Sequence, residues 1–206
     1  MKKILIFIGV VFCLGSAHAA ERKLFDGRTF KGWIGDTNNT FHIQDGAIVG
    51  GTFKEKIPRN EFLCTRREYT NFILKVKFKL LGGAQANGGV QFRTQRHEND
   101  NEVSGYQADM GDPSWWGCLY DESRRNKVLA QAPVDEVKKV LKRDDWNQYE
   151  IRAEGKHIRI FLNGAKTVDY TEDDASIPDH GIIAVQIHAG PPSEAWYKDI
   201  SIMELP

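Results

Sequence analysis

The segment at residues 72–80 alternates between two kinds of side chain, and this alternation constrains the fold more than any other feature of the 206-residue chain. A period of two residues predicts a β-strand with one face in a hydrophobic core and the other in water. The two faces carry Phe72, Leu74, Val76, Phe78 and Leu80 on one side, and Lys75, Lys77 and Lys79 on the other. The core is therefore expected to be built from β-sheet.

Two-residue turns connect further segments of the same kind. Asp45-Gly46 and Asn163-Gly164 each lie between alternating residues, the pattern typical of β-hairpins. Strands are also expected at residues 41–44, 47–49, 89–94, 105–110, 146–153, 157–162, 165–170, 181–188 and 196–203. Many short strands in a chain with 19 glycines predict an all-β fold: a two-sheet antiparallel β-sandwich or jelly roll.

Only residues 134–141 have a helical pattern. Val134, Val137 and Leu141 recur at helical spacing among charged residues, which predicts one short surface helix.

The N-terminus has the features of an export signal. Lys2 and Lys3 precede an apolar run at residues 4–14, and Ala17-His18-Ala19 forms a small-x-small cleavage pattern. We expect a bacterial-style signal peptide at residues 1–20, a single domain at residues 21–206, and a periplasmic or secreted product. The apolar run is too short to span a bilayer, so no membrane insertion is expected after cleavage.

Charge and cysteine content restrict the partners. Removing Lys2 and Lys3 from the 28 basic residues leaves 26 against 28 acidic ones, a formal charge of −2. Nothing in this balance favours a nucleic-acid partner. Cys64 and Cys118 remain in a compartment that permits disulfides, and their pairing is left open, as is the oligomeric state.

Three predicted strands alternate apolar residues with polar ones that differ from the usual lysine, glutamate and threonine of a solvated face. The polar positions are Gln91 and Arg93, Gln107 and Asp109, and Gln186 and His188. Each residue alone is compatible with a solvated strand face or a local hydrogen bond. If the three strands are neighbours, these side chains line one polar surface.

The segment at residues 111–126 is expected to be a functional loop. It concentrates Trp115, Trp116, Tyr120, Glu122 and Arg124 between turn-forming residues. Aromatic rings stack on the apolar faces of sugars, and charged groups bind sugar hydroxyls. The alternative is a long loop packed down by its own tryptophans.

No cofactor requirement is indicated. Carboxylates such as Asp109, Asp112, Asp121 and Glu122 could bind a divalent cation such as calcium, but their spacing matches no established calcium loop, and no metal ligand is assigned.

Several motifs resemble the 3-keto-disaccharide hydrolase family. They occur in the family's order over essentially the whole chain after the signal: LFDGRTFKGW (24–33), QDGAI (44–48), REYTNFILKVKFKL (67–80), NGGVQFRT (87–94), WNQYEIRA (146–153), FLNG (161–164) and YKDISIMEL (197–205). The resemblance implies a concanavalin-like jelly roll and a sugar ligand. Carried over by position, it implies these cleft residues: Arg93, Gln107, Asp109, Tyr120, Glu122, Gln186 and His188. Gly105-Tyr106-Gln107 departs from a family pattern that has an acidic residue there.

The resemblance suggests a mechanism, because a 3-keto group acidifies the hydrogen on C2 of a sugar. A base removes that proton, donors stabilise the oxyanion, and the C1 substituent leaves by elimination or net hydrolysis. The residues and roles expected are His188 or Asp109 as base, Arg93 as oxyanion stabiliser, Glu122 or Tyr120 as leaving-group acid, Trp115 or Trp116 as stacking platform, and Gln91, Gln107, Arg124 and Gln186 as substrate contacts.

Three rival functions stay open. Direct hydrolysis requires Asp109 and Glu122 to flank one glycosidic bond. A non-catalytic carbohydrate-binding module requires an open groove lined by aromatic rings. A laminin-G-like adhesion domain requires a large exposed apolar patch and little pocket.

Overall fold

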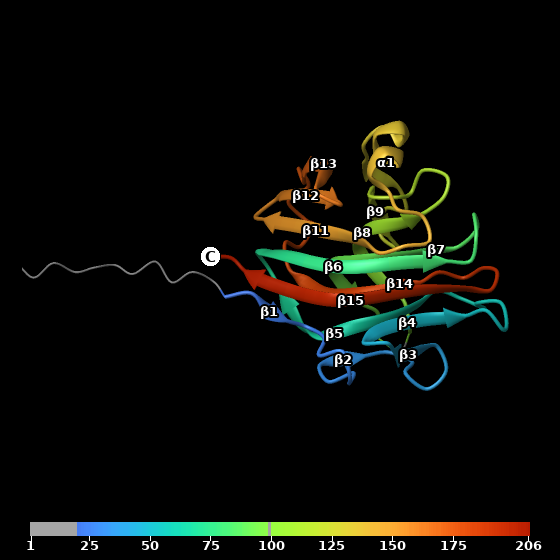
Figure 1. The fold of residues 1–206 in the computed structure, drawn as a ribbon. Coiled ribbons are helices and arrows are strands. Elements are labelled where there is room, and N and C mark those ends of the chain that lie inside the picture. Colours follow the sequence, from blue (N-terminus) through green and yellow to red (C-terminus); the bar gives the residue numbers. More distant parts are fainter. Residues whose placement is uncertain (1–19, 99) are drawn as a thin grey trace, which may run out of the picture.

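The computed structural model describes residues 20–98 and 100–206, and it consists almost entirely of two antiparallel β-sheets packed face to face (Figure 1). The first sheet has the strand order β13 (Ala165–Thr171), β12 (His157–Leu162), β11 (Asn147–Glu154), β6 (Phe72–Leu81), β15 (Ser193–Glu204), β4 (Ala47–Thr52), β3 (Phe41–Gln44), with β1 (Arg22–Lys23) pairing to β15. The second sheet has the order β10 (Val128–Ala130), β9 (Leu119–Glu122), β8 (Val103–Gly111), β7 (Asn87–Arg96), β14 (Gly181–Ile187), β5 (Glu61–Tyr69), β2 (Trp33–Ile34). The predicted two-sheet antiparallel sandwich is confirmed.

The half-buried strand predicted from the alternation at residues 72–80 is confirmed. In β6 every second side chain from Phe72 onward is buried in the core between the sheets, and the intervening lysines are partly exposed. The core continues with Val90 and Phe92 from β7 and Ile151 from β11. The helix is also confirmed, as α1 (Val134–Val140), with Val137 as its buried residue.

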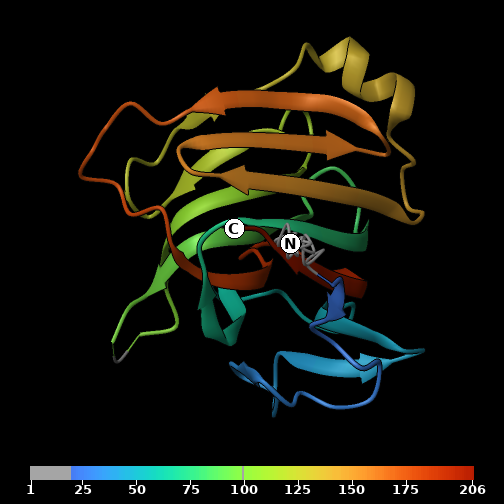
Figure 2. The same cartoon turned by 90° about the vertical axis from the view of Figure 1, so that its left-hand side faces the viewer.

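The two ends of the described chain lie side by side in the first sheet. β1 lies beside the C-terminal end of β15 (Figure 2), with Arg22 opposite Ile202. The predicted signal peptide, apart from Ala20, lies outside the described residues. Within the part that the structure describes, no helix has the length and apolar character needed to cross a membrane.

One long strand, β5, and four strands of two to four residues, β1, β2, β9 and β10, are absent from the sequence prediction. β5 has no clean alternation, because Glu61 to Thr65 are all buried and the next three residues are exposed. β9 lies within the segment 111–126, where a loop is expected, since the charged residues Asp121 and Glu122 mask a strand in which both are buried; β10 follows that segment. Cys64 in β5 and Cys118 just before β9 are both buried, free thiols.

Candidate functional site

The three strands with unusual polar residues are neighbours in the second sheet, in the order β8, β7, β14. Gln91 lies opposite Gln107, and Gly89 lies between Asp109 on one side and Gln186 on the other. Since Val90 and Phe92 point into the core, this polar row points outward from the sandwich.

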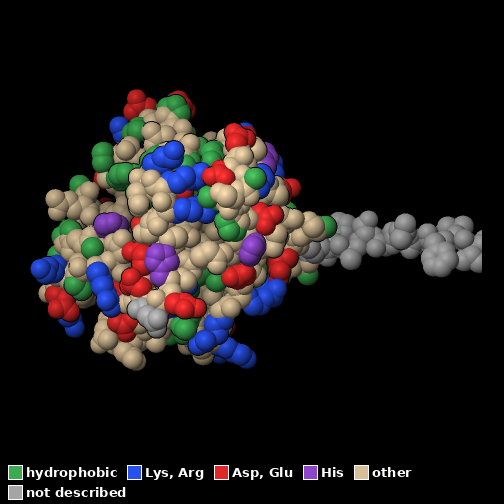
Figure 3. Space-filling view, turned by 180° about the vertical axis from the view of Figure 1, so that it is seen from behind, with side chains coloured by type: hydrophobic (Ala, Val, Ile, Leu, Met, Phe, Trp, Pro, Cys, Tyr) green, Lys and Arg blue, Asp and Glu red, His purple; other side chains and the backbone are tan. Residues whose placement is uncertain are grey.

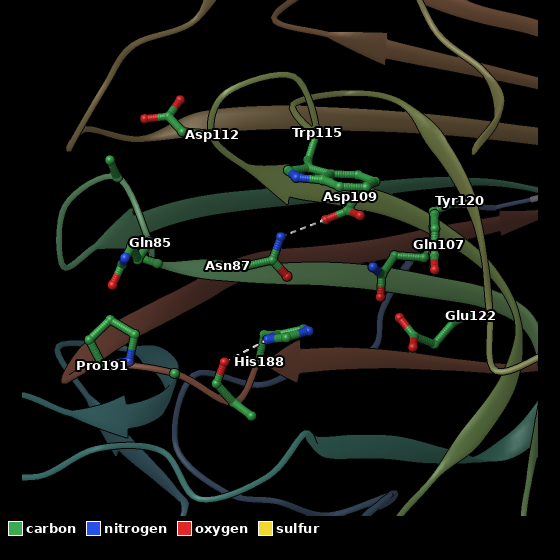
Figure 4. A pocket seen from close by; sticks show the side chains of 14 residues that line it. Gln85, Asn87, Gln107, Asp109, Asp112, Trp115, Tyr120, Glu122, His188 and Pro191 are labelled. Atoms are coloured by element: carbon green, nitrogen blue, oxygen red, sulfur yellow. Dashed lines mark hydrogen bonds between the residues drawn. The ribbon is translucent and has the colours of Figure 1, made fainter. Parts of the chain in front are cut away.

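The polar row forms the floor of an open pocket of about 470 Å³ (Figure 4). Six of the predicted site residues line it: Gln107, Asp109, Trp115, Tyr120, Glu122 and His188. Loop residues 84–86 and 189–191 form the remaining walls. The half-buried Trp115 stands over Asp109, with its ring edge-on to that of Tyr120 at a centroid distance of 5.8 Å.

A glycine at the centre of the floor sets the position of Gln107. A Cβ atom added at Gly89 would lie 2.5 Å from Cδ of Gln107, so only glycine lets that amide lie across β7. Oε1 of Gln107 accepts a hydrogen bond from Nε2 of the fully buried Gln91. The amide nitrogen of Gln107 is thereby directed toward the two carboxyl groups beside it.

Those carboxyl groups are unusually weak acids. Burial raises the pKa of Asp109 to about 7, and the charge of Glu122 acts in the same direction. Burial likewise raises the pKa of Glu122 to about 7, with Glu102 and Asp121 adding repulsion. A carboxyl with a pKa near 7 exists in both protonation states at neutral pH, which general acid or base chemistry requires.

Asp109 is held by two donors that leave one of its oxygens free. Oδ1 accepts hydrogen bonds from the backbone N–H of Met110 at 2.7 Å and from Nδ2 of Asn87 at 3.2 Å (Figure 4). Oδ2 therefore remains to carry the proton when the group is neutral.

The half-buried His188 follows β14, and its ring extends into the pocket (Figure 4). Nδ1 lies 2.7 Å from the carbonyl oxygen of Ala189. Because a carbonyl oxygen only accepts, Nδ1 carries the hydrogen, and the neutral ring keeps Nε2 unprotonated. The backbone around the ring is fixed as well, since Asn60 Oδ1 accepts the N–H of Ala189 at 3.0 Å.

Two core tyrosines of the first sheet support the floor from behind. The hydroxyl of Tyr149 donates to the carbonyl oxygen of Asp109 and accepts the N–H of Gly117 at 2.8 Å. The hydroxyl of Tyr197 lies 2.5 Å from the carbonyl oxygen of Gln186 and 3.2 Å from that of Gly89. The strands that carry Asp109 and His188 are thereby attached to the opposite sheet.

Arg93 is a correction to the predicted site. Its φ of 47° marks a β-bulge, and the registers of β7 with β8 and with β14 both shift there. The bulge breaks the period of two, so the guanidinium leaves the polar row. It donates instead to the carbonyl oxygens of Thr70, at 2.8 Å from Nε, and Gly155.

Trp116 and Arg124 also lie away from the pocket. The Trp116 ring is 8% exposed and stacks on Phe78, while its Nε1 donates to Asp112 at 2.8 Å. This matches the alternative of a segment packed down by its own tryptophan. Arg124 donates from Nε to Asp121 at 2.8 Å and lies over the ring of Tyr106. Gln91 and Gln186 are buried beneath the pocket rather than facing it, and Gln186 Nε2 lies 3.4 Å from Glu122 Oε2.

A buried ion-pair clasp fixes the strand that carries Glu122. Arg125 pairs with Asp121 of β9 and, at 2.7 Å, with Glu172, which follows β13 of the other sheet. The hydroxyl of Tyr106 also donates to Glu172, at 2.6 Å. Burial opposes ionisation of Glu172, yet the hydrogen bonds from Arg125 and Tyr106 hold its pKa at about 2. The clasp therefore keeps β9 in place with Tyr120 and Glu122 facing the pocket.

Asn87 and Asp112 line the pocket but are not among the predicted substrate or catalytic residues, although Asp112 is one of the carboxylates considered for a cation. Asn87 extends the alternation of Gln91 and Gly89 along β7 by one step, and this pattern could have predicted that Asn87 faces the pocket. Asp112 is positioned by its ion pair with Arg143, 31 residues away, and no local pattern indicates that contact. Among residues 20–98 and 100–206, no group of three or more histidine, cysteine or carboxylate side chains is arranged to hold a metal ion.

This combination of an outward polar pocket and a two-sheet jelly roll is typical of carbohydrate-active proteins. Residues 20–203 match the family model of the 3-keto-alpha-glucoside-1,2-lyase-like domain, and the chain belongs to this family. The family named from the sequence motifs is thereby confirmed.

Solved structures share the fold at low sequence identity. A Parabacteroides distasonis protein provisionally named a glycosyl hydrolase is 20% identical, with a TM-score of 0.65 over 90% of this chain and 94% of that one. The carbohydrate-binding module CBM66 of Bacillus subtilis is 14% identical, with a TM-score of 0.62 over 84% and 96%. A Bacillus subtilis protein of unknown function with a galectin-like fold is 11% identical, with a TM-score of 0.62 over 91% and 96%. No curated protein sequence matches the chain.

Proposed function

We propose that the protein cleaves 3-keto-glycosides by removing the proton on C2 and expelling the substituent on C1. The observation that carries the proposal is the meeting, in one pocket, of an imidazole with a fixed tautomer and two carboxyl groups whose pKa is about 7. Family membership supports the substrate class.

His188 is the base in this proposal. Its Nε2 takes the C2 proton, and the electron pair of the C–H bond moves into an enolate whose charge lies on the C3 oxygen. The neutral tautomer needed for this step is the one that the Ala189 carbonyl selects.

Asp109 replaces Arg93 as the group that stabilises the enolate. A neutral carboxyl in an apolar site can donate a hydrogen bond to an oxyanion, and the raised pKa of Asp109 keeps this group protonated up to about pH 7. The amide nitrogens of Asn87 and Gln107 lie beside it as further donors.

Glu122 is the leaving-group acid. As the enolate collapses, the C1–O bond breaks, a C1=C2 double bond forms, and the departing oxygen takes the Glu122 proton. The Oε1 atom of Gln186 has no partner among the described residues, and turning this amide over gives the protonated Glu122 an acceptor. Addition of water to the double bond would complete net hydrolysis.

The non-catalytic binding module is the second candidate, because CBM66 shares the fold. The placement of a histidine and two carboxyl groups around one pocket favours the enzyme, since an aromatic groove would suffice for binding. The adhesion alternative has less support. Hydrophobic side chains are scattered over the face seen in Figure 3, and the exposed large ones among the described residues are Ile34 and Phe53.

The test is to incubate the purified protein with 3-keto-glucosides and with the matching unoxidised glucosides, with and without a chelator. Release of the leaving group from the 3-keto series alone supports elimination. Cleavage of both series would favour direct hydrolysis by the two carboxyl groups. Tight binding of either series without turnover would favour the binding module.

Export is a separate proposal that rests on residues 1–20. Expression in a bacterium with this N-terminus intact should give a periplasmic or secreted product that starts near Ala20 or Glu21, as N-terminal sequencing would reveal. A cytoplasmic product with Met1 retained would contradict it.

A further inference from the structure

A second pocket lies on the opposite side of the sandwich, on the outer face of the first sheet. It has a volume of about 480 Å³, and its walls include Lys77, Lys142, Lys198, Trp146 and Gln148. It opens over β11, β6 and β15, which form the front layer of Figure 1, whereas the candidate catalytic pocket lies over the second sheet behind them.

Three lysines line this pocket, and the carboxylate of Asp199 forms an ion pair with one of them. Lys198 lies directly opposite Lys77 across the β15–β6 pair, and like charges in that position are mutually destabilising. Asp199 pairs with Lys77 at 2.8 Å. Lys142 and Lys198 have no ion pair within the described part of the chain, and the contact of Lys198 with the Trp146 ring does not neutralise its charge, so two positive charges can attract an anion.

The pocket is rigid on the side that an anion would approach. Asn147 fixes the backbone of Lys142 twice, since its Oδ1 accepts the Lys142 N–H at 2.9 Å and its Nδ2 donates to the Lys142 carbonyl at 2.7 Å. Asn163 Nδ2 in turn donates to Asn147 Oδ1 at 2.7 Å. The backbone of Lys142 is thus held in place at the wall of the pocket.

An indole ring supplies an apolar wall. Lys198 Nζ lies 3.9 Å from the ring centroid of Trp146, and Lys79 Nζ lies between Trp146 and Trp196 at 5.2 and 4.6 Å. Trp146 also packs on the cluster of Ala47, Val49 and Trp196. A ligand here would meet the exposed part of the Trp146 indole beside the ammonium groups that lie over its ring.

We propose that this pocket binds the uronate residues of an acidic polysaccharide. A uronic acid combines a carboxylate, which two ammonium groups attract, with an apolar sugar face that packs on indole. The inference is independent of the catalytic proposal, because no residue of this pocket contributes to the other one. The second pocket would hold the protein on an anionic glycan while the catalytic pocket stays open on the far side.

The test is affinity electrophoresis of the protein in gels that contain polygalacturonate or neutral dextran. Retardation is expected with polygalacturonate alone, and it should weaken as salt rises. The double variant Lys142→Glu/Lys198→Glu should lose at least about tenfold in affinity, because each substitution replaces attraction by repulsion. Lys31→Glu/Lys127→Glu, which changes net charge equally at two exposed lysines that do not line the pocket, should bind like the unaltered protein.

Equal losses in the two double variants would overturn the proposal, because retardation would then reflect net charge alone. Equal retardation by dextran, or binding to phosphatidylglycerol vesicles in preference to polygalacturonate, would also overturn it. Turnover of 3-keto-glucosides by the Lys142→Glu/Lys198→Glu variant separates the two proposals, since this activity should be unchanged.

Discussion

The strands of both sheets alternate apolar and polar residues, but the polar side chains on the two outer faces differ in type and in exposure to water. On the first sheet the polar positions of β6 are lysines, such as Lys77 with its side chain 43% exposed. On the second sheet the polar positions of β7 and β8 are amides and a carboxyl, among which Gln91 is 0% and Asp109 3% exposed. The difference arises because loops and β9 enclose the second face, while the first stays open to water.

This contrast shows what burial does to a polar strand face. Exposed lysines act on ligands through the field they create together. Buried carboxyls lose hydration, their pKa rises to about 7, and they become proton donors and acceptors at neutral pH. The same alternation therefore yields a charged surface in one sheet and a candidate catalytic pocket in the other.

The largest effect should come from removing the base on the second face. His188→Asn should lower kcat on 3-keto-glucosides by a factor of about 10²–10⁴, the usual contribution of a general base. Steady-state kinetics on the variant, with a melting curve to confirm that it folds, would measure this. A His188→Asn protein with unchanged kcat would remove the histidine from the mechanism.

The next effect concerns the pH dependence of stability at Asp109. Because its folded pKa of about 7 exceeds the ordinary value of 3.8, the folded state holds this proton more tightly, and stability falls as the pH rises toward 7. Asp109→Asn keeps the acceptor for Met110 and removes the charge. It should raise the free energy of unfolding at pH 8 by a few kcal/mol and change it little near pH 4.

Urea unfolding of both proteins at the two pH values checks this prediction. An equal change at both pH values would show that the carboxyl is not a raised-pKa group. The same variant tests the oxyanion role, since Asn can still donate from Nδ2. Asp109→Asn should retain more activity than Asp109→Leu. Because asparagine does not deprotonate, the activity of Asp109→Asn should also fall less above pH 7 than that of the unaltered protein.

A smaller effect is expected at the clasp behind Glu122. Glu172→Gln leaves the half-buried Arg125 and the buried Tyr106 with a weaker acceptor and should cost about 2 kcal/mol of unfolding free energy at pH 7. The matched control is Glu154→Gln, which breaks an ion pair with Arg159 on the outer face of the first sheet. The Glu154 side chain is 45% exposed, so this variant should cost under about 1 kcal/mol. Equal costs for the two variants would mean that burial does not distinguish these pairs.

The sequence predicts the sandwich well because its evidence is local. The alternation at 72–80, the hairpin turns and the helix at 134–141 all depend on neighbours in the chain, and each agrees with the structure. The polar rows of β7, β8 and β14 were also visible locally. Their adjacency was not, because strand order depends on contacts between residues up to about a hundred positions apart.

The errors in the site have physical causes that spacing does not reveal. Alternation predicts that Arg93 shares a face with Gln91, but a bulge with left-handed backbone turns it away. Composition places Trp115 and Trp116 together, whereas the structure puts one over the pocket and the other in the core. A β-bulge and a buried ion pair such as that of Asp121 with Arg125 both depend on tertiary context.

The smallest stability effect, and the one that most sharpens the comparison, is expected for Asp199 on the first sheet. The hydrogen bond from Lys77 lowers the pKa of this carboxyl, so its contribution to stability is present at neutral pH and disappears as the pH falls, the reverse of Asp109. Because the Asp199 side chain is 59% exposed, Asp199→Asn should change the unfolding free energy by less than about 1 kcal/mol. Asparagine also tolerates the φ of 49° at this position. The variant leaves Lys77 unpaired beside Lys142 and Lys198, so polygalacturonate binding should become tighter while unfolding is nearly unaffected. Weaker binding in Asp199→Asn would show that the lysine face does not act through its positive charge.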